Sequence, residues 1–264
     1  MRTDLKRVAL VAAHFPPSNL AAVHRARLWA QHLHEFGWKP IIITTHWRYY
    51  EENLDWALCD LLASELQVIR TRALPTKPIR LIGDIGFRAL VWHFAALRQL
   101  LKNQEIDFLH ITVPSFYSAL LGELIYRRRP FPFGIDYIDP WVQPMPDGTR
   151  KLSKPWLAIK MGHLLEPWAV RRASLITGIS EGYYSPTLDR NPHLRENAIH
   201  APMPYGNSEN DFELARRTGN RPYIFDPSDG SYHFIYAGAL LPRARPVLER
   251  LFQALAHLKN ERLL

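Results

Sequence analysis

Short apolar runs alternate with segments of helical periodicity along most of the chain. The first run, Arg7–Ala13, is nearly continuous and is therefore typical of a strand covered on both faces of a parallel sheet. Apolar residues then recur at helical spacing through Leu20–Leu33, which predicts an amphipathic helix. Gly37 is suited to end that helix in the left-handed conformation, and Pro40–Thr45 predicts the next strand. The chain therefore opens with a predicted β-α-β unit.

The same alternation continues as far as Met203. Further strands are predicted at Leu66–Thr71, Ile106–Thr112, Phe133–Ile138, Ser174–Ile179 and Ile199–Met203. Further helices are predicted at Leu81–Asn103, Pro114–Tyr126 and Leu157–Arg172, and another follows Ser180. Strands that alternate with helices indicate a parallel sheet covered by helices. We therefore predict that residues 1–205 form an α/β domain with a doubly wound, Rossmann-like parallel sheet.

The pattern changes between residues 206 and 232. This segment is rich in Asn, Ser, Asp, Gly and Pro, and it predicts a linker with a short helix near Glu209–Arg217. Residues 233–264 then predict one strand, Phe234–Ala237, and one helix, Val247–Leu258. A single βα unit cannot bury its own apolar face. We therefore expect that residues 233–264 begin a second Rossmann-like domain that continues beyond this chain.

Composition and charge narrow the class of protein. Apolar residues make up 47% of the chain and charged residues 22%, as in globular proteins. The formal net charge of +8 favours anionic partners, such as nucleotide diphosphates, acidic lipid headgroups or nucleic acid. Cys59 is the single cysteine, so an internal disulfide is excluded, which fits a reducing cytoplasm. No apolar run reaches the roughly 18 residues that a membrane-spanning helix needs.

The segment after the first strand is the first candidate site. In parallel α/β sheets, ligands bind beyond the carboxyl ends of the strands, and Phe15–Ala22 lies at such an end. No G-x-G-x-x-G and no G-x-x-x-x-G-K occurs, which disfavours a Rossmann dehydrogenase and a P-loop nucleotidase. His14 ends the strand beside this segment. The alternative is an ordinary loop in which Ser18 or Asn19 caps the following helix.

Two more strand ends carry polar residues. Pro140 disfavours helix at Asp139, so the carboxylate should project from the strand end, where it can hold a sugar hydroxyl or accept a proton. Ser180 and Tyr183 follow the next predicted strand, and the tyrosine can stack on a ligand. The alternatives are a loop-capping role for Asp139 and a helix-capping role for Ser180. The 12 histidines form no metal-binding pattern, and no D-x-D occurs.

Segments in the same order resemble the N-terminal domain of family-4 glycosyltransferases: FPPSNLAAVHRARLWAQHLHEFGWKPIIITTH, IDFLHITVPSFYSALLG, GIDYIDPW, LEPWAVRRASLITGISEGYY and PMPYGNSENDF. FIYAGALLP resembles the opening of their C-terminal domain. The resemblance implies a GT-B fold, in which two Rossmann-like domains face each other across a cleft. It also implies that the first domain binds the acceptor and the second binds the nucleotide sugar. Transfer is then expected with retained anomeric configuration, without a cofactor or an essential metal.

The resemblance assigns expected roles by position. The residues expected to face the donor diphosphate are Phe15, Pro16, Pro17, Ser18, Asn19, Gly238 and Arg245. Asp139 is expected to be catalytic, and the acceptor side of the cleft is expected to include His14, Asp136, Ser180 and Tyr183. Two features depart from the family: Ser18 and Asn19 replace paired glycines, and no glutamate is followed by another eight residues later. In relatives this glutamate pair lies beyond the position where this chain ends.

These features favour a glycosyltransferase of cell-surface polysaccharide or glycoconjugate assembly. We expect a glycan or lipid-linked acceptor and a cytoplasmic location at the inner face of the membrane. Peripheral membrane contact would use the basic surface and the Trp- and Phe-rich segment Arg80–Lys102, for which a core-facing helix is the alternative. A non-catalytic binding domain that needs a separate C-terminal domain is the alternative function. No nucleic-acid partner is expected, because no recognised binding motif occurs.

Overall fold

The structure is a computed structural model of the chain, and it describes residues 5–77, 83–103, 105–217, 224–236, 238, 240 and 242–261. The chain divides into two compact units, Met1–Leu214 and Ala215–Leu264. The border between them falls inside helix α7 (Glu209–Arg217). The predicted boundaries at residues 205 and 232 stay predictions.

Unit 1 is built on a parallel sheet. Its strands are β1 (Lys6–Val11), β2 (Trp38–Thr45), β3 (Gln67–Thr71), β4 (Phe108–Val113), β5 (Phe133–Tyr137), β6 (Leu175–Gly178) and β7 (Ile199–Pro202). They form a seven-stranded sheet in the order β3-β2-β1-β4-β5-β6-β7, and every pairing is parallel. This arrangement confirms the predicted α/β, Rossmann-like fold.

Helices follow the strands as the sequence pattern predicts. Unit 1 contains α1 (Val23–His32), α2 (Ile85–Lys102), α3 (Leu120–Arg128), α4 (Lys154–Val170), α5 (Glu181–Arg190) and α6 (Leu194–Asn197). Short 3-10 helices occur at η1 (Leu33–Phe36), η2 (Trp47–Tyr49), η3 (Trp56–Leu61) and η4 (Phe116–Ala119). The first two residues of the predicted helix Leu81–Asn103 lie outside the described residues. Gly37 ends η1 at φ 79°, as predicted.

The predicted cap of the first helix is wrong. Helix α1 begins at Val23, and within the described chain no side chain caps its first turn. Ser18 and Asn19 both precede Ala22, which occupies the N-cap position. The Ser18 hydroxyl bonds instead to Glu52 at 2.5 Å. A tertiary hydrogen bond therefore takes the side chain that local sequence rules assign to the helix.

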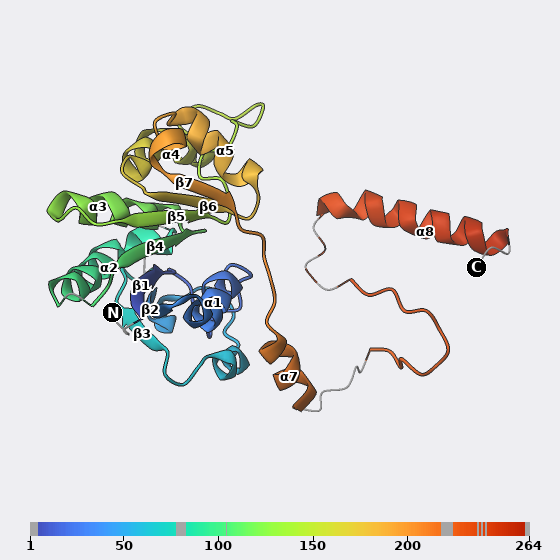
Figure 1. The fold of residues 1–264 in the computed structure, drawn as a ribbon. Coiled ribbons are helices and arrows are strands. Elements are labelled where there is room, and N and C mark those ends of the chain that lie inside the picture. The colour runs from blue at the N-terminus through green and yellow to red at the C-terminus, as the bar shows by residue number, and fades with distance from the viewer. Residues whose placement is uncertain are drawn as a thin grey trace. The chain divides into compact units, whose positions relative to one another are not determined.

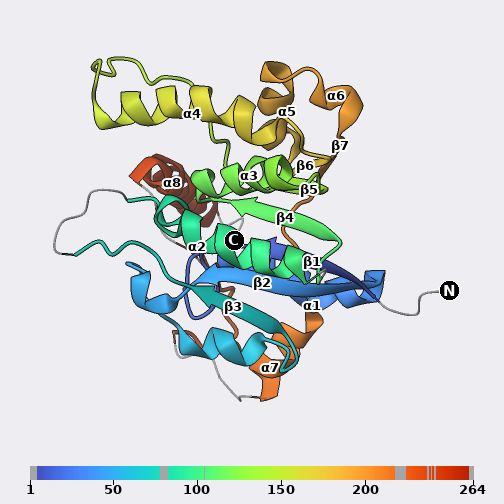
Figure 2. The ribbon, with the colours of Figure 1, turned by 90° about the vertical axis from the view of Figure 1, so that its left-hand side faces the viewer.

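Two hydrophobic clusters lie on opposite faces of the sheet. On one face, α2 to α6 contribute buried side chains to a large cluster with alternate residues of β4, β5 and β6, such as Leu109, Ile135 and Ile176. On the other face, Ala26 and Ala30 of α1 pack on β1 and β2. Figures 1 and 2 show α2 and α3 on one side of the sheet and α1 on the other. Because α1 covers only the β1–β2 region, no described helix of unit 1 covers β4 to β7 on the α1 side.

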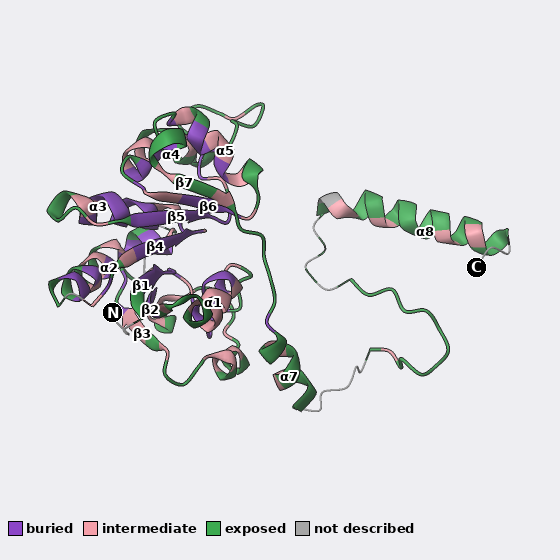
Figure 3. Ribbon diagram, viewed as in Figure 1, coloured by how far each residue is buried: buried purple, intermediate pink, exposed green. Residues whose placement is uncertain are grey.

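Unit 2 contains helix α8 (Arg245–Asn260), preceded by a 3-10 turn, η5 (Pro242–Ala244). The predicted helix Val247–Leu258 is confirmed. The predicted strand Phe234–Ala237 is wrong for residues 234–236, which form no regular structure, and Ala237 lies outside the described residues. A strand needs a neighbouring strand for its backbone hydrogen bonds, and the described part of unit 2 contains no strand that could pair with this segment. No described residue of α8 is buried within the chain (Figure 3).

Candidate functional site

The predicted site segments meet at one edge of the sheet. Parallel pairing of β1, β4, β5 and β6 places the residues after each strand at the same carboxyl edge. Phe15–Asn19 follows β1, Asp139 follows β5, and Ser180 follows β6, so the three segments lie at a common edge. The sheet order also reverses here, because β1 and β4 are neighbours although their connections lead in opposite directions. Ligands of open α/β sheets bind at such a switch point.

The loop after β1 is tied to the segment after β2 and to β3. Arg70 donates to the Pro16 carbonyl at 2.6 Å, and the backbone N–H of Asp55 donates to the Pro17 carbonyl at 2.7 Å. The loop's own donors are also used, since Phe15 N–H bonds to the Tyr50 hydroxyl at 3.1 Å. The N–H groups of Ser18 and Asn19 bond to the carbonyls of Phe15 and Asn53. A diphosphate here would therefore meet side chains rather than a cradle of backbone N–H groups.

His14 and Glu52 form the most distinctive polar pair at this edge. Nδ1 of His14 lies 2.6 Å from Oε1 of Glu52, and the Ser18 hydroxyl donates to the same oxygen at 2.5 Å. The two side chains are 15% and 13% exposed, so solvent still reaches the pair. Burial opposes ionisation of Glu52, but the hydrogen bonds from His14 and Ser18 outweigh it and lower its pKa to about 2. With Nδ1 engaged, Nε2 is the nitrogen that His14 can offer to a ligand.

The start of α2 lies against the segment after β4. Asp84 caps α2 by accepting from Phe87 N–H at 2.7 Å, and burial raises the pKa of its carboxyl, while the nearby charge of His14 lowers it. A Cβ on Gly86 would lie 2.4 Å from the Ser118 hydroxyl oxygen, so only glycine fits this approach. The Ser118 hydroxyl has no hydrogen-bond partner among the described residues. The amino end of α2 thus adds a polar wall beside His14.

Asp136 is buried beneath the edge. Arg25 holds both of its carboxylate oxygens at 2.5 and 2.6 Å, and the Thr177 hydroxyl donates to it at 2.7 Å. Both charged side chains are almost fully excluded from solvent. The Arg25 guanidinium also lies 4.8 Å from the Trp29 ring centroid and 5.5 Å from that of Tyr205. Asp136 therefore holds the Arg25 side chain in place below the predicted cleft. Its predicted contact with an acceptor stays a prediction.

The other predicted acceptor residues lie nearer to solvent. Asp139 and Ser180 are exposed, and Tyr183 is half-buried. Ser180 occupies the N-cap position of α5, but no side-chain hydrogen bond to the described helix is formed. Its hydroxyl is therefore not used as the capping alternative would require. Tyr205 is 41% exposed. Burial raises the pKa of its hydroxyl, and the charges of Asp136 and Asp139 raise it further, whereas that of Arg25 lowers it.

Gly238 and Arg245, the remaining predicted donor residues, belong to unit 2. Gly238 lies in a bend, and Arg245 begins α8, where it pairs with Glu249 one turn later at 2.9 Å. Both arginine and glutamate are well exposed, so this pair contributes little to stability. Their predicted roles toward a donor stay predictions.

Sequence reasoning missed Glu52, Asp84 and Tyr205. Glu52 lies in a connecting segment 38 residues from His14, and no local motif links the two. Asp84 carries a recognisable signal, because an Asp that precedes a helical run by one residue is a common N-cap. Among the described residues, no cluster of three or more His, Cys, Asp or Glu side chains is arranged to hold a metal ion.

The comparisons with known proteins concern the fold. No protein-family profile and no curated protein matches the sequence. Sucrose-phosphate synthase from Thermosynechococcus elongatus is similar in structure, with 13% identity, coverage of 82% of this chain and 53% of that one, and a TM-score of 0.51. Anabaena HepE in complex with UDP-glucose gives 13% identity, coverage of 81% and 50%, and a TM-score of 0.45. A glycosyltransferase from Rickettsia africae gives 12% identity, coverage of 83% of this chain and 51% of that one, and a TM-score of 0.44.

The likeness to sucrose-phosphate synthase concerns the fold of the sheet and its helices. The sheet and its helices have the Rossmann-like arrangement of GT-B glycosyltransferases. The chain spans about half the length of these solved structures. Within the part of the chain that is described, no helix is both long enough and apolar enough to cross a membrane.

Proposed function

We propose that this chain is part of a glycosyltransferase that moves a sugar from a nucleotide-sugar donor to a glycan or lipid-linked acceptor. The supporting observation is the seven-stranded sheet, which resembles that of sucrose-phosphate synthase over 82% of the chain. Other similar structures contain UDP or UDP-glucose, which suits a nucleotide sugar as the donor. The resemblance to family 4 favours retention of anomeric configuration and a mechanism without an essential metal.

In this proposal, unit 1 binds the acceptor at the carboxyl edge of the sheet. The exposed carboxylate of Asp139 holds the hydroxyl groups of the reacting sugars. His14, oriented by Glu52 at 2.6 Å, directs Nε2 to the acceptor hydroxyl. The exposed Asn19 side chain of the loop after β1 faces the donor diphosphate. Gly238 and Arg245 act from the second domain, which supplies most of the nucleotide contacts.

We also propose peripheral contact with an anionic membrane at the inner face. A surface groove between α2 and α3 is lined by four cationic side chains, Arg98, Lys102, Arg128 and Arg129. No carboxylate of the described residues forms an ion pair with them. A cluster of this kind attracts acidic lipid headgroups, with about 1 kcal/mol for each cation near the surface. Such contact suits an enzyme of cell-surface polysaccharide or glycoconjugate assembly.

A non-catalytic binding or partner domain is the second candidate. The loop after β1 favours it, because its bonded backbone N–H groups leave no cradle for a donor diphosphate. A protein of this kind would bind an acceptor through unit 1 and depend on another chain for chemistry.

The deciding experiment measures transfer of labelled sugar. The chain is combined with a family-4 C-terminal domain, supplied by fusion or in trans, and incubated with a panel of nucleotide sugars and lipid-linked or soluble glycans. Acceptor-dependent transfer supports the enzyme, and NMR of the product tests retention at the anomeric carbon. Acceptor binding without transfer under every combination would favour the partner domain instead.

A further inference from the structure

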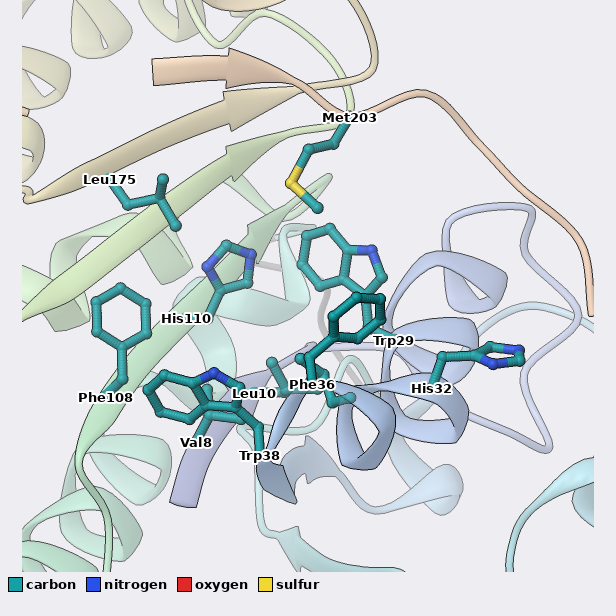
Figure 4. Close-up of a pocket in the computed structure, with 11 residues that line it drawn as sticks. Val8, Leu10, Trp29, His32, Phe36, Trp38, Phe108, His110, Leu175 and Met203 are labelled. Carbon is teal, nitrogen blue, oxygen red and sulfur yellow. The ribbon is translucent and has the colours of Figure 1, made fainter. Parts of the chain in front are cut away.

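An apolar groove with a cavity volume of about 490 Å³ lies on the α1 side of the sheet (Figure 4). Aromatic side chains from α1, η1, β2 and β4 line it, namely Trp29, Phe36, Trp38 and Phe108. No Lys, Arg, Asp or Glu occurs among the described residues that line the groove. The volume is that of a small-molecule site, but the lining offers no charged group to a phosphate and too few polar groups for the hydroxyls of a sugar.

The groove contains two polar atoms whose bonding capacity is unused. Nε2 of His110 and Nε2 of His32 are buried and have no hydrogen-bond partner within the described chain. His110 is 6% exposed, and its ring lies 4.5 Å from that of Trp29. Burial lowers the pKa of His110 to about 4, so its imidazole is neutral at pH 7. An apolar cavity with a few fixed polar groups is the usual pattern of a ligand site.

One end of the groove reaches the carboxyl edge of the sheet. Met203 lines that end, and its backbone N–H donates to the carbonyl of Gly178, the last residue of β6, at 2.7 Å. Figure 4 shows the Met203 side chain pointing toward His110 and Trp29. Trp38 and Phe108, by contrast, are the first residues of their strands and mark the amino side. A long molecule in the groove therefore has one end beside the candidate site.

We propose that this groove binds the hydrocarbon chain of a lipid-linked acceptor, with the head group at the Met203 end and an oxygen near that head bonded to His110. The proposal rests on the proposed function, because the edge beside Met203 is where we place sugar transfer. A polypeptide helix fits less well, because its backbone groups are already bonded and its apolar face would leave Nε2 of His110 without a partner. Met203, with its flexible thioether, can move to admit a chain.

The test uses the full chain and a diazirine-bearing farnesol as the probe. Mass spectrometry should place the crosslinks on peptides that contain Trp29 or Phe108, and unlabelled farnesol should compete. Met203→Trp, at a position 37% exposed, should fill the mouth and lower labelling at least 10-fold. The control, Leu164→Trp on the 67%-exposed surface of α4, should leave labelling unchanged. Labelling that is scattered, or unaffected by Met203→Trp, would overturn the proposal.

A second variant tests the imidazole. His110→Phe keeps the ring but removes the nitrogen, so binding of farnesol should fall at least 5-fold while binding of the hydrocarbon farnesene stays the same. Equal losses for both would reject the hydrogen bond. A dimer in sedimentation that Met203→Trp dissociates would show that a second copy fills the groove, which also overturns the proposal. Groove labelling without sugar transfer to any acceptor would refute the proposed enzyme but not the hydrocarbon site.

Discussion

Asp136 and Asp139 lie close together in the sequence but meet opposite environments. Asp136 belongs to β5, faces the α1 side of the sheet and is held by Arg25 and Thr177. Asp139 follows the end of that strand and is exposed. The same side chain therefore stabilises the fold at one position and is available to a ligand at the other.

This contrast gives a matched pair of variants. Asp139→Asn should reduce sugar transfer by about 100-fold with little change in melting temperature, because an exposed amide cannot replace a carboxylate as a charge or base. Asp136→Asn should instead lower the free energy of unfolding by about 3–5 kcal/mol, because it leaves Arg25 as a buried charge. Thermal melts and initial rates on both proteins check this. Unchanged transfer with a lower melting temperature in Asp139→Asn would assign that residue to loop capping.

Glu52 should affect sugar transfer through its hydrogen bond with His14. Glu52→Gln removes the negative charge that orients His14, so transfer should fall by about 10- to 100-fold and its pH profile should shift. Glu51→Gln is the control, because Glu51 is the neighbouring carboxylate and lies 3.9 Å from Arg88 rather than at His14. The measurement is kcat/KM between pH 5 and pH 9. Identical profiles for both variants would remove His14 and Glu52 from the mechanism.

Two buried histidines should make the fold sensitive to acid. Burial lowers the pKa of His93 and of His110 to about 4, from 6.5 for an exposed histidine. Between these values the unfolded chain binds more protons, so stability is complete above pH 6.5 and is lost as the pH falls toward 4. Each site can contribute up to about 3 kcal/mol to this loss. Urea unfolding at pH 7 and pH 5 should show a smaller difference for His93→Gln or His110→Gln than for the exposed control His163→Gln.

At the scale of elements, close packing between α3 and β5 depends on a glycine. A Cβ on Gly122 would lie 2.3 Å from the ring of Phe133, which is fully buried. Gly122→Ala should therefore cost about 1–3 kcal/mol through overpacking. Gly182 in α5 has only the Ser180 hydroxyl at 4.0 Å, so Gly182→Ala should be neutral or stabilise the helix by about 0.5–1 kcal/mol. Equal effects in chemical denaturation would contradict this packing.

Element types were predictable from periodicity, whereas their ends depended on tertiary contacts. Leu66–Thr71 and Glu209–Arg217 match β3 and α7 closely, because apolar spacing and turn residues fix them locally. The start of α1 was not predictable, since Glu52, far along the chain, takes the Ser18 hydroxyl. Phe234–Ala237 has the apolar pattern of a strand, but pairing partners are a property of the fold and not of the segment.

At the scale of the whole molecule, the two units differ in how far they pair their own strands and bury their own apolar side chains. Unit 1 has a sheet whose strands find neighbours in the chain and a core on both faces. In unit 2, large apolar side chains such as Phe234, Val247 and Phe252 are exposed within the chain. The candidate site was predictable as an edge, because parallel strands align their carboxyl ends. The partners within it, such as Glu52 for His14, came only from the folded chain.

The last prediction concerns the donor. In the proposed division of labour most nucleotide contacts come from a second domain, so this chain alone should bind nucleotide sugars only weakly and transfer no measurable sugar. The loop after β1 supports this, since the N–H groups of Phe15, Ser18 and Asn19 are already bonded within the chain and cannot grip a diphosphate. With few contacts, little offsets the entropy lost on capturing the ligand. Calorimetry with a panel of nucleotide sugars tests the point, with the chain joined to a C-terminal donor domain as the comparison. Micromolar binding by the isolated chain would place the donor site in unit 1, and the proposed division between the domains would then be wrong.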